Sequence, residues 1–312
     1  MKRITLAALA GAAVLFAGSA FAQQNVDFSK VEIKTTDLGN RTYMLEGQGG
    51  NIVAACGNDA VIQVDTEFAP LHDKIKAAID QACGGKPIKY IVNTHFHGDH
   101  TGGNGAFATK DNATVVAHRN LALRLEHGTT NGLSGQRTQP VAKEAIPTQT
   151  YNSNNGPVLQ VAGRTAVVGH PNSAHNDTDS WVFFPDANVL AMGDTTSLGP
   201  RYPTIDYANG GSINGIINTV NNYLAITNGQ TKYVPGHGPL ATRADIVRYR
   251  DMLTAVRYLV RAEIQATKTE DQAVADKPLA AIGKILGSTQ QLDDNMVRMV
   301  YRSLKNTPAN PA

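Results

Sequence analysis

The stretch 88–104 reads IKYIVNTHFHGDHTGGN and joins an apolar run directly to three histidines and an aspartate. Residues 88–94 predict a buried strand, and the polar cluster begins where that strand ends. At a strand end, side chains at alternating positions such as His95 and His97 can face one cavity. Asp99 and His100, just beyond, can then turn toward a second point nearby.

This cluster predicts a metal site. Imidazole and carboxylate are the expected zinc ligands where thiolates are absent. Without a cation, several of these groups would be buried and poorly paired, at a cost of several kcal/mol. A lone histidine is more often a satisfied polar residue, and we assign that structural role to His72, His118, His127 and His170.

One strand end cannot close two coordination spheres, so further ligands must come from other segments. Three other apolar strands end in a polar residue beside a glycine or another small residue, within NSAHNDTDS, LAMGDTT and VPGHGP. Each such residue alone could be a capping or turn residue. Combined with the first cluster, they become candidate ligands: His175, Asp194 and His237.

The 312 residues are 42% apolar and 17% charged, which is typical of a globular protein of one or two domains. Lys2 and Arg3 precede an apolar run that ends in small residues, which predicts a secretory signal peptide over residues 1–22, cleaved after Ala22. The alternative is a membrane anchor, but the run is shorter than the ~20 apolar residues that a span requires. We therefore expect a periplasmic or secreted protein without membrane attachment after cleavage.

The charge of the chain argues against a nucleic-acid partner. Of 28 basic and 26 acidic residues, Lys2 and Arg3 leave with the signal peptide, so 28 minus 2 gives 26 of each sign. Without a basic stripe, nucleic-acid binding loses its electrostatic basis, and we expect a small-molecule substrate. Cys56 and Cys83 can form a disulfide or remain two buried thiols. The sequence does not indicate the oligomeric state.

The order of predicted elements indicates the fold. Residues 31–65 form antiparallel strands with a hairpin turn at 57–59, a helix follows over 70–83, and a second set of strands covers 163–194. Two such halves predict two mixed sheets packed face to face with helices outside. A doubly wound parallel sheet is the alternative, which the hairpins argue against.

Two segments outside these halves have their own character. Residues 131–156 are rich in Asn, Gln, Thr and Gly and predict a long loop. Residues 242–305 predict a helical extension, with capping boxes that start at Thr242, Thr269 and Ser288. We treat residues 23–312 as one domain that carries this extension.

The string H-x-H-x-D-H, followed by one His, one Asp after Met-Gly and one His in PGHG, resembles the metallo-β-lactamase superfamily. The similarity covers roughly residues 31–240 and implies an αβ/βα sandwich with the site at one edge between the sheets. It implies a first metal on His95, His97 and His175, a second on Asp99, His100 and His237, and Asp194 between them. Asp65 in VIQVDT matches the family's first-motif aspartate and would orient a metal ligand by a hydrogen bond without binding the metal itself.

The resemblance also implies a mechanism. The cofactors would be two zinc ions, although a bridging carboxylate also suits iron or manganese. Metal binding lowers the pKa of water from ~15.7 to ~7, so a hydroxide held between the ions can attack a carbonyl. Asp99 would be the catalytic residue that orients this hydroxide and carries its proton.

The fold alone does not fix the substrate. An exported protein of this type fits the opening of a cyclic amide, and we expect a β-lactam. Typical secreted zinc β-lactamases have Cys or Ser where Asp194 stands, so lactone or thioester hydrolysis is the alternative, and a non-catalytic metal-binding protein is the third. Residues 199–212 should line the pocket, with Tyr202 or Ser212 as candidates for substrate contact.

Overall fold

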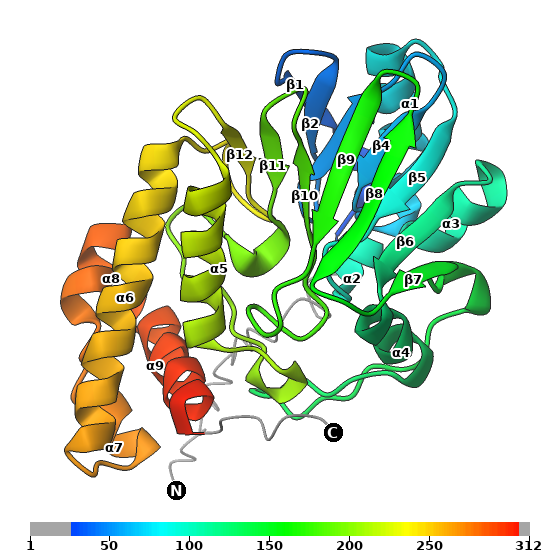
Figure 1. Cartoon of the computed structure of the whole chain (residues 1–312). Coiled ribbons are helices and arrows are strands. Elements are labelled where there is room, and N and C mark those ends of the chain that lie inside the picture. Colours follow the sequence, from blue (N-terminus) through cyan, green and yellow to red (C-terminus); the bar gives the residue numbers. More distant parts are fainter. Residues whose placement is uncertain (1–25, 306–312) are drawn as a thin grey trace, which may run out of the picture.

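Two β-sheets packed face to face form the centre of the protein (Figure 1). The structure is a computed structural model and describes residues 26–305, so the predicted signal peptide lies outside the described residues. The first sheet has the order β1-β2-β3-β4-β5-β6-β7 and the second the order β12-β11-β10-β9-β8. The strands of the first sheet are β1 (Lys34–Asp37), β2 (Thr42–Glu46), β3 (Ile52–Cys56), β4 (Val61–Val64), β5 (Ile88–Val92), β6 (Thr114–His118) and β7 (Gln149–Tyr151). Those of the second sheet are β8 (Asn155–Val161), β9 (Arg164–Gly169), β10 (Trp181–Phe184), β11 (Val189–Ala191) and β12 (Lys232–Val234).

Helices cover the outer faces of both sheets. They are α1 (His72–Cys83), α2 (Gly98–Thr101), α3 (Asn104–Lys110), α4 (Arg119–His127), α5 (Ile213–Ile226), α6 (Arg243–Gln265), α7 (Glu270–Ala275), α8 (Ala280–Leu286) and α9 (Gln290–Lys305). Helices α1 and α3 cover the first sheet, and α5 and α6 cover the second (Figure 1). This arrangement confirms the predicted αβ/βα sandwich and excludes a doubly wound sheet.

The core between the sheets explains the alternating patterns of the strands. Val53 and Ile62 of the first sheet share one buried cluster with Val182 and Phe184 of the second. Because successive strand residues face opposite sides, the residues between them pack against the outer helices instead. Each sheet is therefore apolar on both faces, and its ends are left to carry polar side chains.

A disulfide joins Cys56 at the end of β3 to Cys83 at the end of α1. Their Cα atoms lie 5.4 Å apart, inside the range that a disulfide spans, although 27 positions separate them in the chain. Gly84, with φ +68°, ends α1 in the left-handed conformation that glycine adopts without strain. The structure thus settles the question that the sequence left open.

The prediction of one long loop over residues 131–156 is wrong in part. Strand β7 pairs in parallel with β6 inside this segment, and β8 begins at Asn155. Both are edge strands of their sheets and carry exposed polar residues such as Gln149 and Asn155. Edge strands are commonly polar, so composition made them look like a loop.

The helical extension has two of its three predicted starts. Thr242 and Thr269 form the predicted capping boxes of α6 and α7. The third prediction is wrong by one residue, because Thr289 rather than Ser288 accepts the hydrogen bond from the Leu292 N–H, at 3.3 Å.

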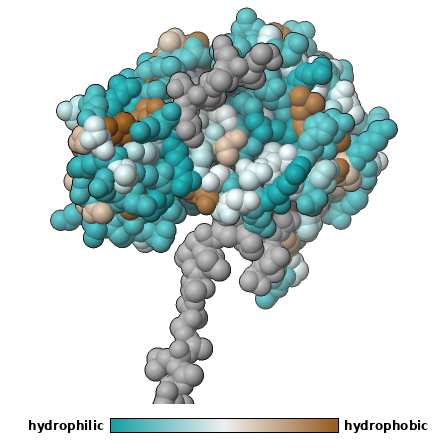
Figure 2. Space-filling model, turned by 90° about the horizontal axis from the view of Figure 1, so that it is seen from below, coloured by the Kyte–Doolittle hydropathy of each residue, from teal (hydrophilic) through white to brown (hydrophobic). Residues whose placement is uncertain are grey.

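The surface of the described residues is mainly polar. Figure 2 shows one face on which hydrophobic residues are scattered in small groups among hydrophilic ones. Such scattered apolar residues are normal for a protein surface. Among residues 26–305, no helix combines the length and apolar character needed to cross a bilayer.

Candidate metal centre

The seven candidate ligands meet at one edge of the sandwich, where strands of both sheets end. His95 and His97 follow β5, and Asp99 and His100 lie in the short helix α2. From the second half come His175 in the loop after β9, Asp194 in the turn after β11, and His237 after β12. Parallel pairing of β11 with β12 brings the last two strand ends together. The structure thus brings every predicted ligand into one of two adjoining groups.

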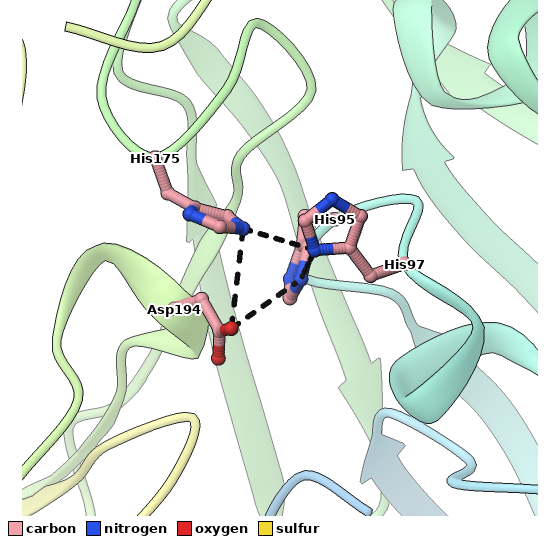
Figure 3. Close-up of side chains that lie close together, drawn as sticks. All are labelled: His95, His97, His175 and Asp194. Carbon is pink, nitrogen blue, oxygen red and sulfur yellow. Dashed lines mark hydrogen bonds and ion pairs between the residues drawn. The ribbon is translucent and has the colours of Figure 1, made fainter. Parts of the chain in front are cut away.

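The first ligand group contains His95, His97, His175 and Asp194, whose side chains point toward a common centre (Figure 3). His97 Nδ1 lies 3.1 Å from both His95 Nε2 and His175 Nε2. Asp194 Oδ2 lies 3.8 Å from His95 Nε2 and 3.9 Å from His175 Nε2. A tetrahedral zinc ion with bonds of ~2.0–2.1 Å separates its ligands by about 3.3 Å. The first group therefore fits one such cation.

The second ligand group contains Asp99, His100 and His237 and shares Asp194 with the first. His237 Nε2 lies 3.3 Å from His100 Nε2 and 3.1 Å from Asp99 Oδ2. Asp194 Oδ1 lies 3.3 Å from His100 Nε2 and 3.5 Å from His237 Nε2. Asp194 thus offers one oxygen to each group, as the bridging role requires. Its Oδ1 is buried and accepts no hydrogen bond, which a cation would compensate.

Hydrogen bonds on the far side of the rings fix which nitrogen faces the centre. His100 Nδ1 donates to Asp65 Oδ2 at 2.8 Å, and His97 Nε2 donates to Asp206 Oδ2 at 3.1 Å. His175 Nδ1 donates to the Thr204 carbonyl at 2.8 Å. Since carboxylates and carbonyls only accept, each of these rings carries a hydrogen on its outer nitrogen and, when neutral, presents a lone pair to the centre. Such facing lone pairs repel unless a cation lies between them, so the rings are arranged as metal ligands.

Sequence reasoning found only one of these supporting residues. Asp65 holds His100 as predicted, but Asp206 and Thr204 were missed. Both lie in the segment 199–212, which we call the cleft loop, and neither belongs to a recognisable motif. An acidic residue in a segment expected to line the pocket was the available signal.

The pKa values of His175 and Asp99 favour the protonation states that bind a cation, whereas the Asp194 carboxylate raises the pKa of His237 and, against the effect of burial, that of His100, so a cation at the second group would displace protons. Burial, assisted by His97, lowers the pKa of His175 to about 4. Burial alone would raise the pKa of Asp99, but the charge of His100 and a hydrogen bond from His237 outweigh it and lower it to about 2. At neutral pH the imidazole is therefore neutral and the carboxylate ionised, as metal ligands must be.

Glycines allow the backbone to approach the ligands closely. A Cβ atom on Gly236, within PGHG, would lie 2.0 Å from Asp194 Oδ1. One on Gly50 would lie 2.0 Å from Cε1 of His100. Because no real Cβ atom tolerates such distances, a side chain at either position would displace a ligand.

A cleft of about 240 Å³ opens over the second group and is lined by Asp99, Asp194 and His237. The cleft loop forms part of its wall through Arg201 and Tyr202, as predicted. Ser212, the other candidate for substrate contact, does not line this cleft, and its hydroxyl caps α5 by accepting the Gly215 N–H.

The remaining histidines lie outside both groups. His72 pairs with Asp73 and Asp111 at 2.7 Å each, and His118 stacks on His170 with ring centroids 3.7 Å apart. His127 is exposed on α4. These positions agree with the structural role assigned to them from the sequence.

Comparison with known proteins identifies relatives. The family model described as the metallo-beta-lactamase superfamily matches residues 35–252. A hydroxyacylglutathione hydrolase of Nitrosococcus oceani is 26% identical over 227 residues, which cover 72% of this chain and 76% of that protein. The alpha subunit of a 2,4-dinitroanisole O-demethylase from Nocardioides sp. is 27% identical over 168 residues, 54% of this chain but only 44% of that subunit.

Solved structures show the same fold at low identity. A metallo-beta-lactamase from Pontibacter korlensis is 16% identical with a TM-score of 0.57, over 72% of this chain and 99% of that one. A stereoselective inverting sec-alkylsulfatase from Pseudomonas sp. is 15% identical with a TM-score of 0.65, over 89% of this chain and 51% of that one. At these identities the likeness concerns the fold alone.

Proposed function

Because the chain belongs to the metallo-beta-lactamase superfamily, whose members are mostly metal-dependent hydrolases, we propose that it binds two zinc ions and opens the cyclic amide of a β-lactam. The observation that carries the metal pair of this proposal is the position of Asp194, with one carboxylate oxygen directed at each ligand group. Two groups that share a carboxylate fit a pair of divalent ions better than one.

The side chains of the site have distinct tasks in such a reaction. When bound, the two ions would supply a hydroxide near neutral pH and polarise the substrate carbonyl. Asp99, ionised and 3.1 Å from His237 Nε2, can take the proton of the attacking water on Oδ2 and return it to the leaving nitrogen. Asp65, Asp206 and the Thr204 carbonyl keep the imidazole lone pairs turned inward.

Hydrolysis of a lactone or thioester is the second candidate. Two observations favour it: Asp194 stands where typical secreted zinc β-lactamases have Cys or Ser, and one relative is named a hydroxyacylglutathione hydrolase. The same residues would act on an ester or thioester carbonyl. Only the leaving group would change, from nitrogen to oxygen or sulfur.

One experiment separates these candidates. The purified protein is analysed for bound metals, and its turnover of a chromogenic cephalosporin, a lactone and a thioester is measured with and without a chelator. We expect two ions per chain and chelator-sensitive cephalosporin hydrolysis. Faster turnover of the lactone or thioester would establish the second candidate. Chelator-insensitive turnover, or none on any substrate with two ions bound, would overturn the enzyme proposal and favour a non-catalytic metal-binding protein.

We also propose that the protein is exported. The disulfide between Cys56 and Cys83 supports this location, since such bonds persist in oxidising compartments and are rare in the cytosol. Cell fractionation and sequencing of the mature N-terminus test the proposal. We expect a first residue of Gln23, and an uncleaved cytosolic protein would contradict it.

A further inference from the structure

Helix α9 lies along the cleft loop, although it is outside the residues that match the family. The family model ends at residue 252, within α6, whereas α9 covers Gln290–Lys305. Met299 and Val300 of α9 share a buried cluster with Tyr202 and Ile205 of the cleft loop. The extension therefore contacts the wall of the cleft directly.

Hydrogen bonds join α9 to Tyr207 in the cleft loop and to Ile213 just after it. Arg302 Nη1 donates to the Tyr207 hydroxyl and, at 3.2 Å, to the Gly132 carbonyl. Its guanidinium also lies over the Tyr207 ring, 5.4 Å from the centroid. Farther along, Ser303 Oγ accepts the Ile213 N–H at 3.0 Å. Residues 205–213 are thus held against one face of α9.

The guanidinium of Arg302 is itself held in place. Glu270 of α7 accepts hydrogen bonds from its Nε at 2.7 Å and its Nη2 at 2.8 Å. Because Nε and Nη2 form this paired, planar contact with the carboxylate, Nη1 remains available to donate to other groups. Nη1 donates to the Tyr207 hydroxyl, so the position of the tyrosine depends on the packing of the helical extension.

The cleft loop, whose second half α9 holds, carries the outer hydrogen-bond partners of His97 and His175 in the first ligand group. Thr204 accepts the hydrogen bond from His175, and Asp206, next to Tyr207, accepts the one from His97. In the second group, His100 is held by Asp65 from the first half of the chain. A displacement of the cleft loop would therefore affect the two groups unequally.

We propose that α9 positions the ligands of the first metal, with Arg302 as a positioning residue that acts through Tyr207 on Asp206 and His97. The inference rests on the metal pair of the proposed function but not on its substrate. The role of the helical extension is then to keep the imidazoles of His97 and His175 in the orientation that a divalent ion requires.

Arg302→Met tests this inference against Arg298→Met as matched control. Arg298, one turn earlier, pairs with the same Glu270 and with Asp271, and its ion pairs lie on α7 and not on the cleft loop. Both variants lose an arginine of α9 that pairs with Glu270, through two hydrogen bonds in Arg302 and one in Arg298. Cobalt(II), whose visible absorption depends on its ligands, is titrated into each metal-free protein, and His237→Ala identifies the signal of the second group.

For Arg302→Met we expect the affinity of the first group to fall by about tenfold, at the lower end of the effect of outer-partner substitutions on metal sites. The second group and the Arg298→Met control should stay within about twofold of the wild type. Amide hydrogen exchange in residues 203–209 of the metal-free protein should accelerate in Arg302→Met alone.

Equal losses in both groups, equal effects of both arginine variants, or unchanged affinity of the first group would overturn the inference. If Arg302→Met does not fold, Tyr207→Phe removes the hydrogen bond from Arg302, together with the one that the Tyr207 hydroxyl donates to the Gly132 carbonyl, and must reproduce the selective loss. Wild-type protein that binds no cobalt would overturn this inference and the proposed function together. Two-metal protein that hydrolyses nothing would overturn the proposed function alone.

Discussion

Asp65→Asn should weaken the second ligand group without disturbing the backbone. Asp65 is buried and accepts three hydrogen bonds: from Thr94 N–H at 2.7 Å, from Thr94 Oγ1 at 2.7 Å and from His100 Nδ1 at 2.8 Å. Its φ of 62° is left-handed, a conformation that asparagine tolerates better than most residues. The substitution therefore changes the hydrogen bonding and charge, with little added backbone strain.

Either orientation of the new amide is unfavourable. If its NH2 replaces Oδ2, it faces His100 Nδ1, and the imidazole must move its hydrogen to Nε2, where it blocks the metal. If it replaces Oδ1, the buried Thr94 N–H loses its acceptor, at about 1–3 kcal/mol, and His100 Nδ1 donates to a neutral amide oxygen, which is a weaker acceptor than the carboxylate. Loss of an outer partner costs about 10- to 100-fold in metal affinity, or roughly 1.4–2.8 kcal/mol. We expect a similar loss of about 2 kcal/mol in the unfolding free energy of the metal-free protein.

Stepwise cobalt titration and urea unfolding measure the two quantities separately. Asp206→Asn is the natural counterpart, because its carboxylate holds His97 of the first group instead. We expect Asp65→Asn to weaken the second group selectively and Asp206→Asn the first. Unchanged affinity of the second group in Asp65→Asn would refute the argument that this carboxylate fixes the imidazole lone pair.

Three further predictions address catalysis, stability and pH. Asp99→Asn should retain the fold but reduce turnover by about 10²- to 10⁴-fold, because the proton acceptor is lost. His127→Ala, in contrast, should leave kcat within about twofold of the wild type. Equal kinetics for both variants would remove Asp99 from the mechanism. Replacing Cys56 and Cys83 together by alanine opens a loop of 27 residues and should lower the unfolding free energy by about 3.5 kcal/mol in urea titrations; an unchanged midpoint would mean that the bond contributes nothing. Burial and a stacked imidazole lower the pKa of His118 from 6.5 to about 4, so between these pH values the unfolded chain binds a proton that the folded chain does not. The unfolding free energy should therefore fall as the pH drops from 6.5 to 4. His118→Gln should flatten this part of the pH profile of stability, and an identical profile would show that His118 does not cause the pH dependence.

The ligands were predictable from sequence because their signals are local. Each lies within eight positions of the end of an apolar strand, and the position of a strand end is set by residues within a few places of it. The caps at Thr242 and Thr269 were predictable for the same reason, since both partners of a capping box are three residues apart.

The features that sequence reasoning missed depend on distant segments. Asp206 becomes important only because His97, 109 positions earlier, lies 3.1 Å away. The bond between Cys56 and Cys83 requires α1 to pack back on the first sheet. Strand β7 is recognisable only through its pairing with β6, because its own residues are polar.

The division of the ligands between the two halves of the chain constrains how the centre can be assembled. Four ligands precede residue 101, but the first group also needs His175 and Asp194, the second needs Asp194 and His237, and both need the second sheet to have docked. A chain that emerges from its N-terminus could therefore hold no metal pair during most of its synthesis. The two ions would therefore bind only after both halves of the chain have been made and the two sheets have packed against each other.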